Sequence, residues 1–311
     1  MKEKLNAIVR PSRKWTDQFV IASLLMLAMF IAGDIVTQLL CRVVPIERLF
    51  SLITSSDGAA QFLYDYFSFF GIWIVFFLMC APFKGNRPIL RQLLPNKNGN
   101  NHKGVLTGLL LGFGINGFCV LMSVIMGDIH LSFHEFNPIL FFTFLFVVLI
   151  QSGAEELTDR VYLYQKLRRR YRHPAVAIVG NGAMFAVLHL LNPGVSVLPV
   201  IELLVTGVLF SLLVYYYDSV WAAIVFHTAW NFTQSIVFGL PNSGLVSEYS
   251  LFRLEAASAR NGLFYTVDFG VEGSIGSTAI HTLLVMILIL INRNKPEKND
   301  VWAENGSGRR I

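Results

Sequence analysis

The sequence predicts an all-α polytopic membrane protein. Hydrophobic residues make up 54% of its 311 positions and charged residues only 14%, a composition far from the soluble globular average. The apolar residues also come in blocks, and about 20 consecutive apolar residues are needed for a helix to cross a bilayer. We therefore expect about eight transmembrane helices, at 17–41, 60–82, 105–127, 139–163, 175–191, 197–216, 219–238 and 272–292.

The first three segments have the features of a helical scaffold. Segment 17–41 is longer than the apolar region of a signal peptide and lacks a small-residue cleavage site, so we expect it to be retained as a span. In the third segment, Gly104, Gly108 and Gly112 recur every four residues. Such a small-xxx-small series predicts that this helix packs closely against a neighbour.

The fourth segment carries four ionisable residues within six positions: Glu155, Glu156, Asp159 and Arg160. A charge at membrane depth costs at least about 2.5 kcal/mol, so it is kept where it is paired, hydrated or used. Glu156 precedes Arg160 by four residues, the favourable order for an ion pair along a helix. Adjacent residues lie about 100° apart around the axis, so Glu155 points away from that pair. Asp159 has no predicted partner.

Three further polar residues lie on the fifth and seventh segments. His189 follows Phe185 by four residues, and His227 precedes Asn231 by four, so each pair shares a helix face. A rise of about 1.5 Å per residue puts Glu155 and Asn231 about 18 Å, His189 about 21 Å and His227 about 12 Å from their cytoplasmic helix ends. The four groups therefore form one layer, which predicts a water-filled cavity opening to the cytoplasm.

Polar residues in other segments have weaker predicted roles. Glu202 and Thr206 share a face of the sixth segment, and His281 of the eighth is assigned to packing. For Asp34 and Asp65 we expect helix-packing hydrogen bonds or a local water, because neither has an evident partner at helical spacing. The polar stretch 239–270 is expected to be an external connector.

The distribution of Lys and Arg predicts that both termini face the cytoplasm. Five basic residues fall in each of four regions, which are the N-terminus, the connectors after the second and fourth segments, and the C-terminal tail. Basic residues are retained on the cytoplasmic side of a membrane. We therefore divide the chain into a basic cytoplasmic arm (1–16), a transmembrane domain (17–292) and a cytoplasmic tail (293–311) expected to be disordered. The net charge of +5 is explained by this topology, and no nucleic-acid partner is predicted.

The polar layer has the chemistry of a hydrolase. An apolar cavity favours protonation of a carboxylate, so Glu155 is the residue we expect to take a proton from water. His189 would hold or polarise that water. His227 and Asn231 supply hydrogen-bond donors suited to a developing oxyanion.

Taken in order, three motifs resemble those of the CPBP intramembrane protease family. They are Glu155-Glu156-x-x-x-Arg160, Phe185-x-x-x-His189 and His227-x-x-x-Asn231. That family joins CAAX prenyl endopeptidases of the Ras-converting type to bacteriocin-processing relatives, also called the Abi family. Each motif alone is weak, whereas three in this order are specific.

The resemblance implies peptide-bond hydrolysis within the membrane, with a catalytic core at 139–238. It implies that Glu155 and His189 activate the water and that His227 and Asn231 form the oxyanion site. Glu156 and Arg160 are then the supporting pair. The first motif departs from the family pattern, because Asp159 and Val161 stand where an aromatic residue and a glycine are usual. Asp159 adds a carboxylate four residues after Glu155.

Three alternatives stay open at the level of sequence. A zinc-dependent protease would use Glu155, His189 and His227 as ligands. No His-Glu-x-x-His motif is present, and a metal-independent mechanism gives Asn231 a role, so we expect no cofactor. A non-proteolytic immunity or sensor protein would use the cavity only for binding. A transporter would place its carboxylates on a proton path, but no inverted repeat is visible.

The expected substrate is a peptide or a membrane-protein segment. The resemblance and the short loops point to a bacterial plasma membrane as the location of this multi-pass protein. They favour a peptide pheromone, a bacteriocin precursor or a membrane-protein fragment over a prenylated CAAX protein. Membrane lipids are the other expected partners.

Overall fold

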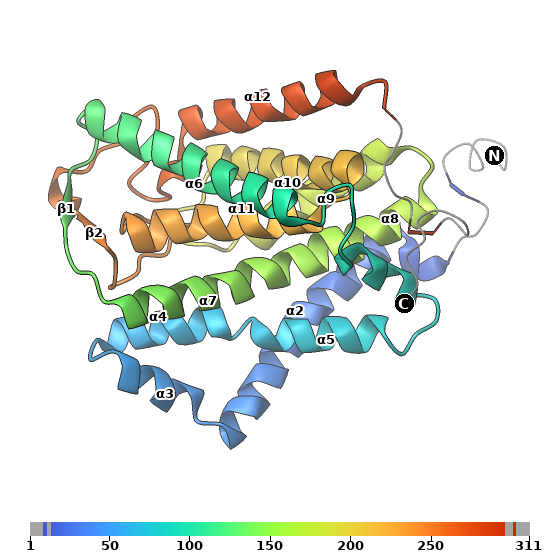
Figure 1. Ribbon diagram of the computed structural model, residues 1–311, viewed down its shortest axis with the longest axis horizontal. Helices are drawn as coiled ribbons and strands as arrows, with labels where there is room; N and C mark the ends of the chain where they lie inside the picture. The colour runs from blue at the N-terminus through green and yellow to red at the C-terminus, as the bar shows by residue number, and fades with distance from the viewer. Residues whose placement is uncertain (1–8, 11–13, 296–300, 303–311) are drawn as a thin grey trace.

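The structure, a computed structural model, describes residues 9–10, 14–295 and 301–302. Most of the described chain is helical, and most of the long helices run roughly along one axis (Figure 1). The α-helices are α2 (Phe19–Val43), α3 (Ile46–Ile53), α4 (Asp57–Phe67), α5 (Phe70–Cys80), α6 (His102–Ile125), α7 (Pro138–Glu156), α8 (Tyr164–Arg170), α9 (Pro174–Leu188), α10 (Val197–Tyr217), α11 (Val220–Phe232) and α12 (Ile275–Asn292). The all-α prediction is confirmed.

Each of the eight predicted segments contains a helix. Among the described residues, six helical stretches are long and apolar enough to cross a membrane: Phe19–Val43, Asp57–Cys80, His102–Ile125, Pro138–Arg170, Val197–Tyr217 and Ile275–Asn292. Of the other two segments, α9 is a shorter apolar helix, and α11 is continued by a π-helical turn, η4 (Thr233–Val237). The total of eight spans and the orientation of the termini stay predictions.

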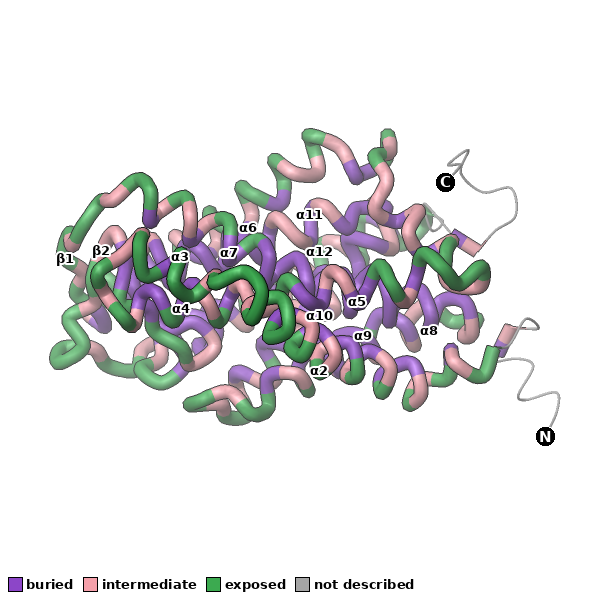
Figure 2. The backbone as a smooth tube through the Cα atoms, turned by 90° about the horizontal axis from the view of Figure 1, so that it is seen from below, coloured by how far each residue is buried: buried purple, intermediate pink, exposed green. Residues whose placement is uncertain are grey.

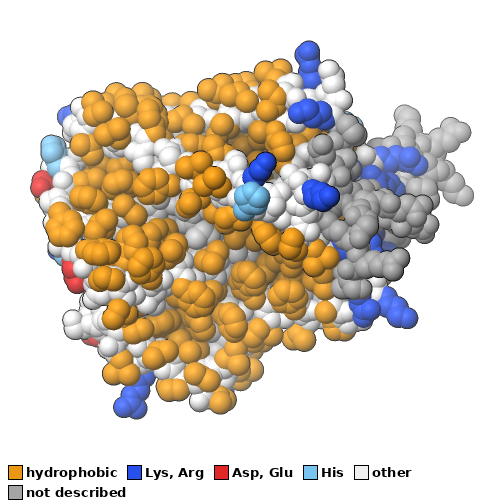
Figure 3. All heavy atoms as spheres, in the orientation of Figure 1, with side chains coloured by type: hydrophobic (Ala, Val, Ile, Leu, Met, Phe, Trp, Pro, Cys, Tyr) orange, Lys and Arg blue, Asp and Glu red, His pale blue; other side chains and the backbone are white. Residues whose placement is uncertain are grey.

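The outer surface of the bundle suits contact with lipid. Hydrophobic side chains cover most of the face seen in Figure 3. Leu24 and Ile31 of α2, Leu110 of α6 and Leu290 of α12 are all more than half exposed. Contiguous apolar surface of this kind is rare on soluble monomers and marks membrane contact.

The predicted fourth segment lies at the centre of the bundle. Residues 150–169 are buried without interruption, and Figure 2 shows buried residues along the inner side of the helices. Helix α7 packs on α4 and α11, α11 packs on α6, and α10 packs on α9 and α12. The charges near the end of α7 are therefore inside the protein rather than in a headgroup region.

Helix α7 does not continue as a regular α-helix. Its last turn leads into a π-helical segment, η3 (Leu157–Leu163), before α8 begins. A second π-helical turn, η4, directly follows α11. Single π-turns inside helices are rare and occur frequently at functional sites. Both π-turns here adjoin the residues that the sequence singled out.

The predicted close packing of the third segment is confirmed, because its glycines face α11. A Cβ atom at Gly108 would lie 2.5 Å from the carbonyl oxygen of Ala222. At Gly112 it would lie 2.4 Å from the carbonyl oxygen of Phe226. Gly114, on the same helix, has open space where its Cβ would be.

Gly112→Val is expected to lower the free energy of unfolding by about 1–3 kcal/mol, because the added side chain forces α6 away from α11. Gly114→Val introduces the same side chain without a clash and is the matched control. Thermal unfolding of the two purified variants in detergent measures the difference. Equal losses in both would show that helix propensity, rather than the α6–α11 contact, controls stability.

The two ends of the bundle differ in character. At one end, strand β1 (Leu131–Phe133) pairs antiparallel with β2 (Phe252–Leu254). At the other end lies α8, where Arg169 and Lys166 contact the buried carboxylate of Asp17. Part of the basic connector is therefore buried. The predicted arm and tail are described only in part, and Trp302 of the tail lies over the guanidinium of Arg169 at 4.0 Å.

Candidate active site

Glu155 occupies the last turn of α7, where it is buried. Its Oε1 accepts a hydrogen bond of 2.6 Å from the side-chain amide of Gln151, one turn earlier. Its Oε2 has no hydrogen-bond partner among the described residues and lies 3.8 Å from Nε2 of His227. One carboxylate oxygen is thus held in place, and the other is available to a bound molecule.

Glu156 is the last residue of α7, and its side chain contacts one residue of η3 and one of α11. Its Oε2 lies 3.2 Å from Nε of Arg160, which confirms the predicted ion pair. Its Oε1 accepts a 3.0 Å hydrogen bond from Nδ1 of His227. The guanidinium of Arg160 is fully buried and lies over the rings of Phe185 and Phe210, at 4.5 and 5.1 Å. The ion pair between Glu156 and Arg160 fixes the orientation of the His227 ring.

Asn231 lies one turn after His227 on the same face of α11, as predicted. Its Nδ2 donates to Oε1 of Gln151 at 3.2 Å and to Oγ of Ser152 at 3.4 Å. Gln151 therefore connects Asn231 with Glu155. Gln151 was not among the predicted site residues, although its position four residues before Glu155 places the two side chains on one helix face.

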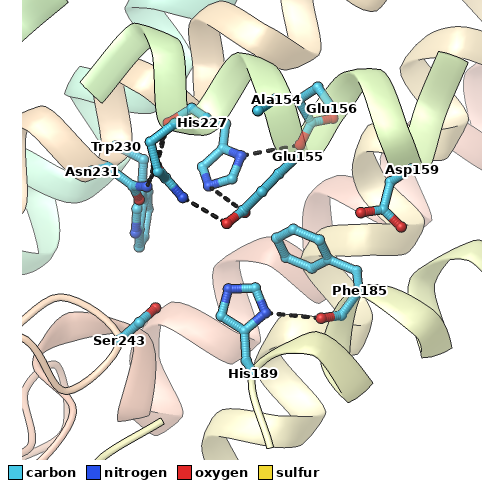
Figure 4. Close-up of polar contacts among 12 residues, drawn as sticks. Ala154, Glu155, Glu156, Asp159, Phe185, His189, His227, Trp230, Asn231 and Ser243 are labelled. Atoms are coloured by element: carbon cyan, nitrogen blue, oxygen red, sulfur yellow. Dashed lines mark hydrogen bonds and ion pairs between the residues drawn. The ribbon is translucent and has the colours of Figure 1, made fainter. Parts of the chain in front are cut away.

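His189 ends α9 on the opposite side of the site. Its Nδ1 lies 2.8 Å from the carbonyl oxygen of Phe185, so Nδ1 carries the proton and donates. In the neutral ring, Nε2 is then an acceptor. Figure 4 shows His189 facing Glu155, His227 and Asn231 across a gap. No hydrogen bond joins His189 to these three residues within the described part of the chain.

The four residues line one cavity of about 250 Å³, which confirms that the fold brings them together. Its expected opening to the cytoplasm stays a prediction. No lining residue comes from the two basic connectors, whereas Asn242, Ser243 and Leu245 of the segment predicted to be external line the cavity. That segment folds back because Glu272 accepts hydrogen bonds from Trp230 (3.1 Å) and from Oγ of Ser243 (2.8 Å).

Asp159 is fully buried and has partners that the sequence did not predict. Its Oδ1 accepts a 3.4 Å hydrogen bond from Asn181, which in turn accepts one from Ser211. Its Oδ2 lies 3.8 Å from Nη1 of Arg160. Asp159 does not line the cavity. It therefore lies beside Arg160 as a second acidic residue.

Two expectations for the other polar residues are wrong. Asp34 and Asp65 each have a partner at helical spacing, because Gln38 and Gln61 donate to them at 2.8 and 2.7 Å. His281 does more than pack, since its Nδ1 lies 2.6 Å from a carboxylate oxygen of Glu202. Amide donors at helical spacing were visible in the sequence, but the contact with His281 joins two distant helices.

The zinc alternative assigns Glu155, His189 and His227 as ligands, and it stays open. Among the described residues, no three His, Cys, Asp or Glu side chains are placed to hold a metal ion. His227 uses Nδ1 for Glu156, and its Nε2 lies 3.8 Å from Glu155. The three candidate ligands line one cavity.

Residues 136–233 match the model of a family described as type II CAAX prenyl endopeptidase Rce1-like. This match, over about a third of the chain, supports the CPBP/CAAX protease family. The matched stretch runs from just before α7 to the end of α11, so all three motifs lie within this family segment. No curated protein and no solved structure gives a significant match. Together with six apolar helices, the family indicates an integral membrane protease of the CAAX type.

Proposed function

We propose that the chain is an intramembrane endopeptidase in which Glu155 activates the attacking water. The observation that carries this proposal is the unpartnered Oε2 of Glu155 in a cavity that His189, His227 and Asn231 also line. A general base must reach the proton that it takes, and this oxygen is the one free to do so. The family provides independent support, because its members are proteases.

The reaction can be written with this chain's own residues. Nε2 of His189 accepts a hydrogen bond from the water and orients it, while Glu155 takes the water's other proton as oxygen attacks the peptide carbonyl. Asn231 and a doubly protonated His227 donate to the oxyanion. Glu155 then gives its proton to the leaving amine nitrogen, and the C–N bond breaks. The products are a carboxylic acid and an amine.

Glu156 and Arg160 support this chemistry from behind the cavity. Glu156 holds Nδ1 of His227, which leaves Nε2 of the same ring toward Glu155. Arg160 neutralises Glu156, and its guanidinium lies over two aromatic rings. A histidine held in one orientation donates to an oxyanion at a smaller entropic cost than a mobile one.

The proposed substrate is a peptide or membrane-protein segment, cleaved in a bacterial plasma membrane by a protein with both termini in the cytoplasm. The basic connectors and the apolar helices support this placement. The test compares the membrane peptides of cells that produce the wild-type chain with those of cells that produce Glu155→Gln. Peptides that accumulate uncut in the variant identify the substrate.

The proposed mechanism requires no metal, so activity is expected to survive exhaustive chelation. The purified wild-type chain is treated with 1,10-phenanthroline and EDTA, its bound metals are measured by mass spectrometry, and its cleavage rate is compared with that of the untreated protein. Retention of the rate at well below one metal per chain is the expected result. One zinc per active chain, with activity lost on chelation and restored by zinc, would favour the zinc alternative.

A further inference from the structure

Acidic residues in the cavity wall outnumber the one cationic group that the proposed mechanism places there, the doubly protonated His227. Asp65, Glu155, Glu202 and Glu272 line it, and no lysine or arginine does so among the described residues. Gln61, Gln151, Trp230 and Ser243 donate to three of these carboxylates, and all four are neutral. The nearby Arg160 is paired with Glu156 and Asp159 instead. The cavity therefore favours a cationic ligand group.

The fourth carboxylate, Glu202, forms a separate cluster with α12. Its Oε1 accepts from Nδ1 of His281 at 2.6 Å, from Thr206 at 3.2 Å and from Ser277 at 3.1 Å. Because Nδ1 of His281 donates to a carboxylate, Nε2 of the neutral ring is an acceptor. This Nε2 is buried and has no hydrogen-bond partner among the described residues. Buried acceptors normally have a hydrogen-bond partner, so this nitrogen in the cavity wall suits an N–H donor of a ligand.

Aromatic rings beside this cluster suit the same ligand. The ring of Trp230 lies 4.8 Å from that of His281, and the ring of Phe226 lies 6.0 Å from it. Both rings line the cavity. Aromatic faces attract ammonium and guanidinium groups, most strongly where water is excluded. Glu202, His281 and Trp230 thus offer an anion, an acceptor and a ring face.

We propose that Glu202 and His281 form a specificity subsite that binds a positively charged group of the peptide substrate. The inference rests on the proposed endopeptidase function, and it names the substrate class as apolar peptides with a basic side chain or a free amino group. Glu202 lies in the same cavity as Glu155, so a single bound peptide contacts both. An acidic residue or a carboxylate at the subsite would meet like charge.

The test measures binding without turnover. The full-length Glu155→Gln chain in detergent is titrated with four fluorescent apolar decapeptides that differ only at the central residue or at the N-terminus. Three have blocked termini and carry lysine, norleucine or glutamate at the centre, and the fourth carries norleucine with a free N-terminus. We expect the lysine peptide to bind about tenfold more tightly than the blocked norleucine peptide, a ratio that corresponds to about 1.4 kcal/mol. Tighter binding of the fourth peptide alone would identify an N-terminal amine as the ligand.

Variants of Glu202 and His281 test whether these two residues cause the tighter binding of the lysine peptide. Glu202→Gln and His281→Phe, each added to Glu155→Gln, are expected to reduce the lysine-to-norleucine ratio to below about threefold, less than 1 kcal/mol. The exposed Asp34→Asn keeps the ratio and is the control, because Asp34 lies outside the cavity. Since the readout is a ratio, a partly unfolded sample lowers the binding of all peptides alike.

Three outcomes would overturn the subsite: equal binding of all peptides, preference for glutamate, or a ratio unchanged in both subsite variants. Absence of cleavage by the wild-type chain would instead overturn the endopeptidase function and leave the binding result standing. The two proposals therefore fail in distinguishable ways.

Discussion

Glu155→Gln is expected to reduce peptide hydrolysis by a factor of about 10² to 10⁴, because general-base catalysis contributes that much and an amide cannot take a proton from water. The fold should survive the change. Glutamine has nearly the same volume, and its side-chain oxygen can still accept from Gln151, which now donates to Oε1 of Glu155 at 2.6 Å. Loss of activity would then come from chemistry rather than from unfolding.

The measurement is the cleavage rate of a peptide that accumulates in cells producing the Glu155 variant, with purified chains in detergent. Glu47→Gln makes the same replacement at an exposed position of α3 and is expected to cleave at the wild-type rate. Unchanged cleavage by Glu155→Gln would refute its role as the base. If Glu155→Gln and His189→Ala also preserve the cellular phenotype, the cavity serves for binding and the chain is a sensor or immunity protein.

Arg160→Leu is expected to lower the free energy of unfolding by about 3–5 kcal/mol, the usual cost of removing one partner from a buried ion pair. Arg160 is fully buried between the carboxylates of Glu156 and Asp159, 3.2 and 3.8 Å away. Its removal leaves those anions without a counter-charge. Catalysis should also fall, because Glu156 positions His227 through a 3.0 Å hydrogen bond.

Unfolding of the purified variant in detergent, followed by circular dichroism, measures this loss. Arg42→Leu, at the exposed end of α2, removes the same charge from the surface and should change stability by less than about 1 kcal/mol. Adding Glu156→Leu to Arg160→Leu is expected to recover part of the loss, because paired apolar replacements of a buried ion pair are often tolerated. Equal losses for Arg160→Leu and Arg42→Leu would contradict the buried-network interpretation.

The sequence by itself determined the helices and the contacts within them. The apolar blocks predicted the spanning segments, and the four-residue spacing of Glu156 and Arg160 predicted their ion pair, since helix geometry fixes which side chains share a face. Spacing also predicted that His227 and Asn231 lie together. The small-xxx-small glycines predicted a close helix contact, although not that the partner is α11.

Only the tertiary structure decided which helix faces pack against each other. The bond between His227 and Glu156 joins residues 71 positions apart, and the bond between His281 and Glu202 joins residues 79 apart. Such contacts depend on the rotation and tilt that each helix takes when it packs, which no local pattern records. The π-turn η3 also changes the helical phase after Glu156. The layer of polar groups was therefore predictable from depth along each helix, whereas the partners of Asp159, the role of Gln151 and the acidic wall around Glu202 were not.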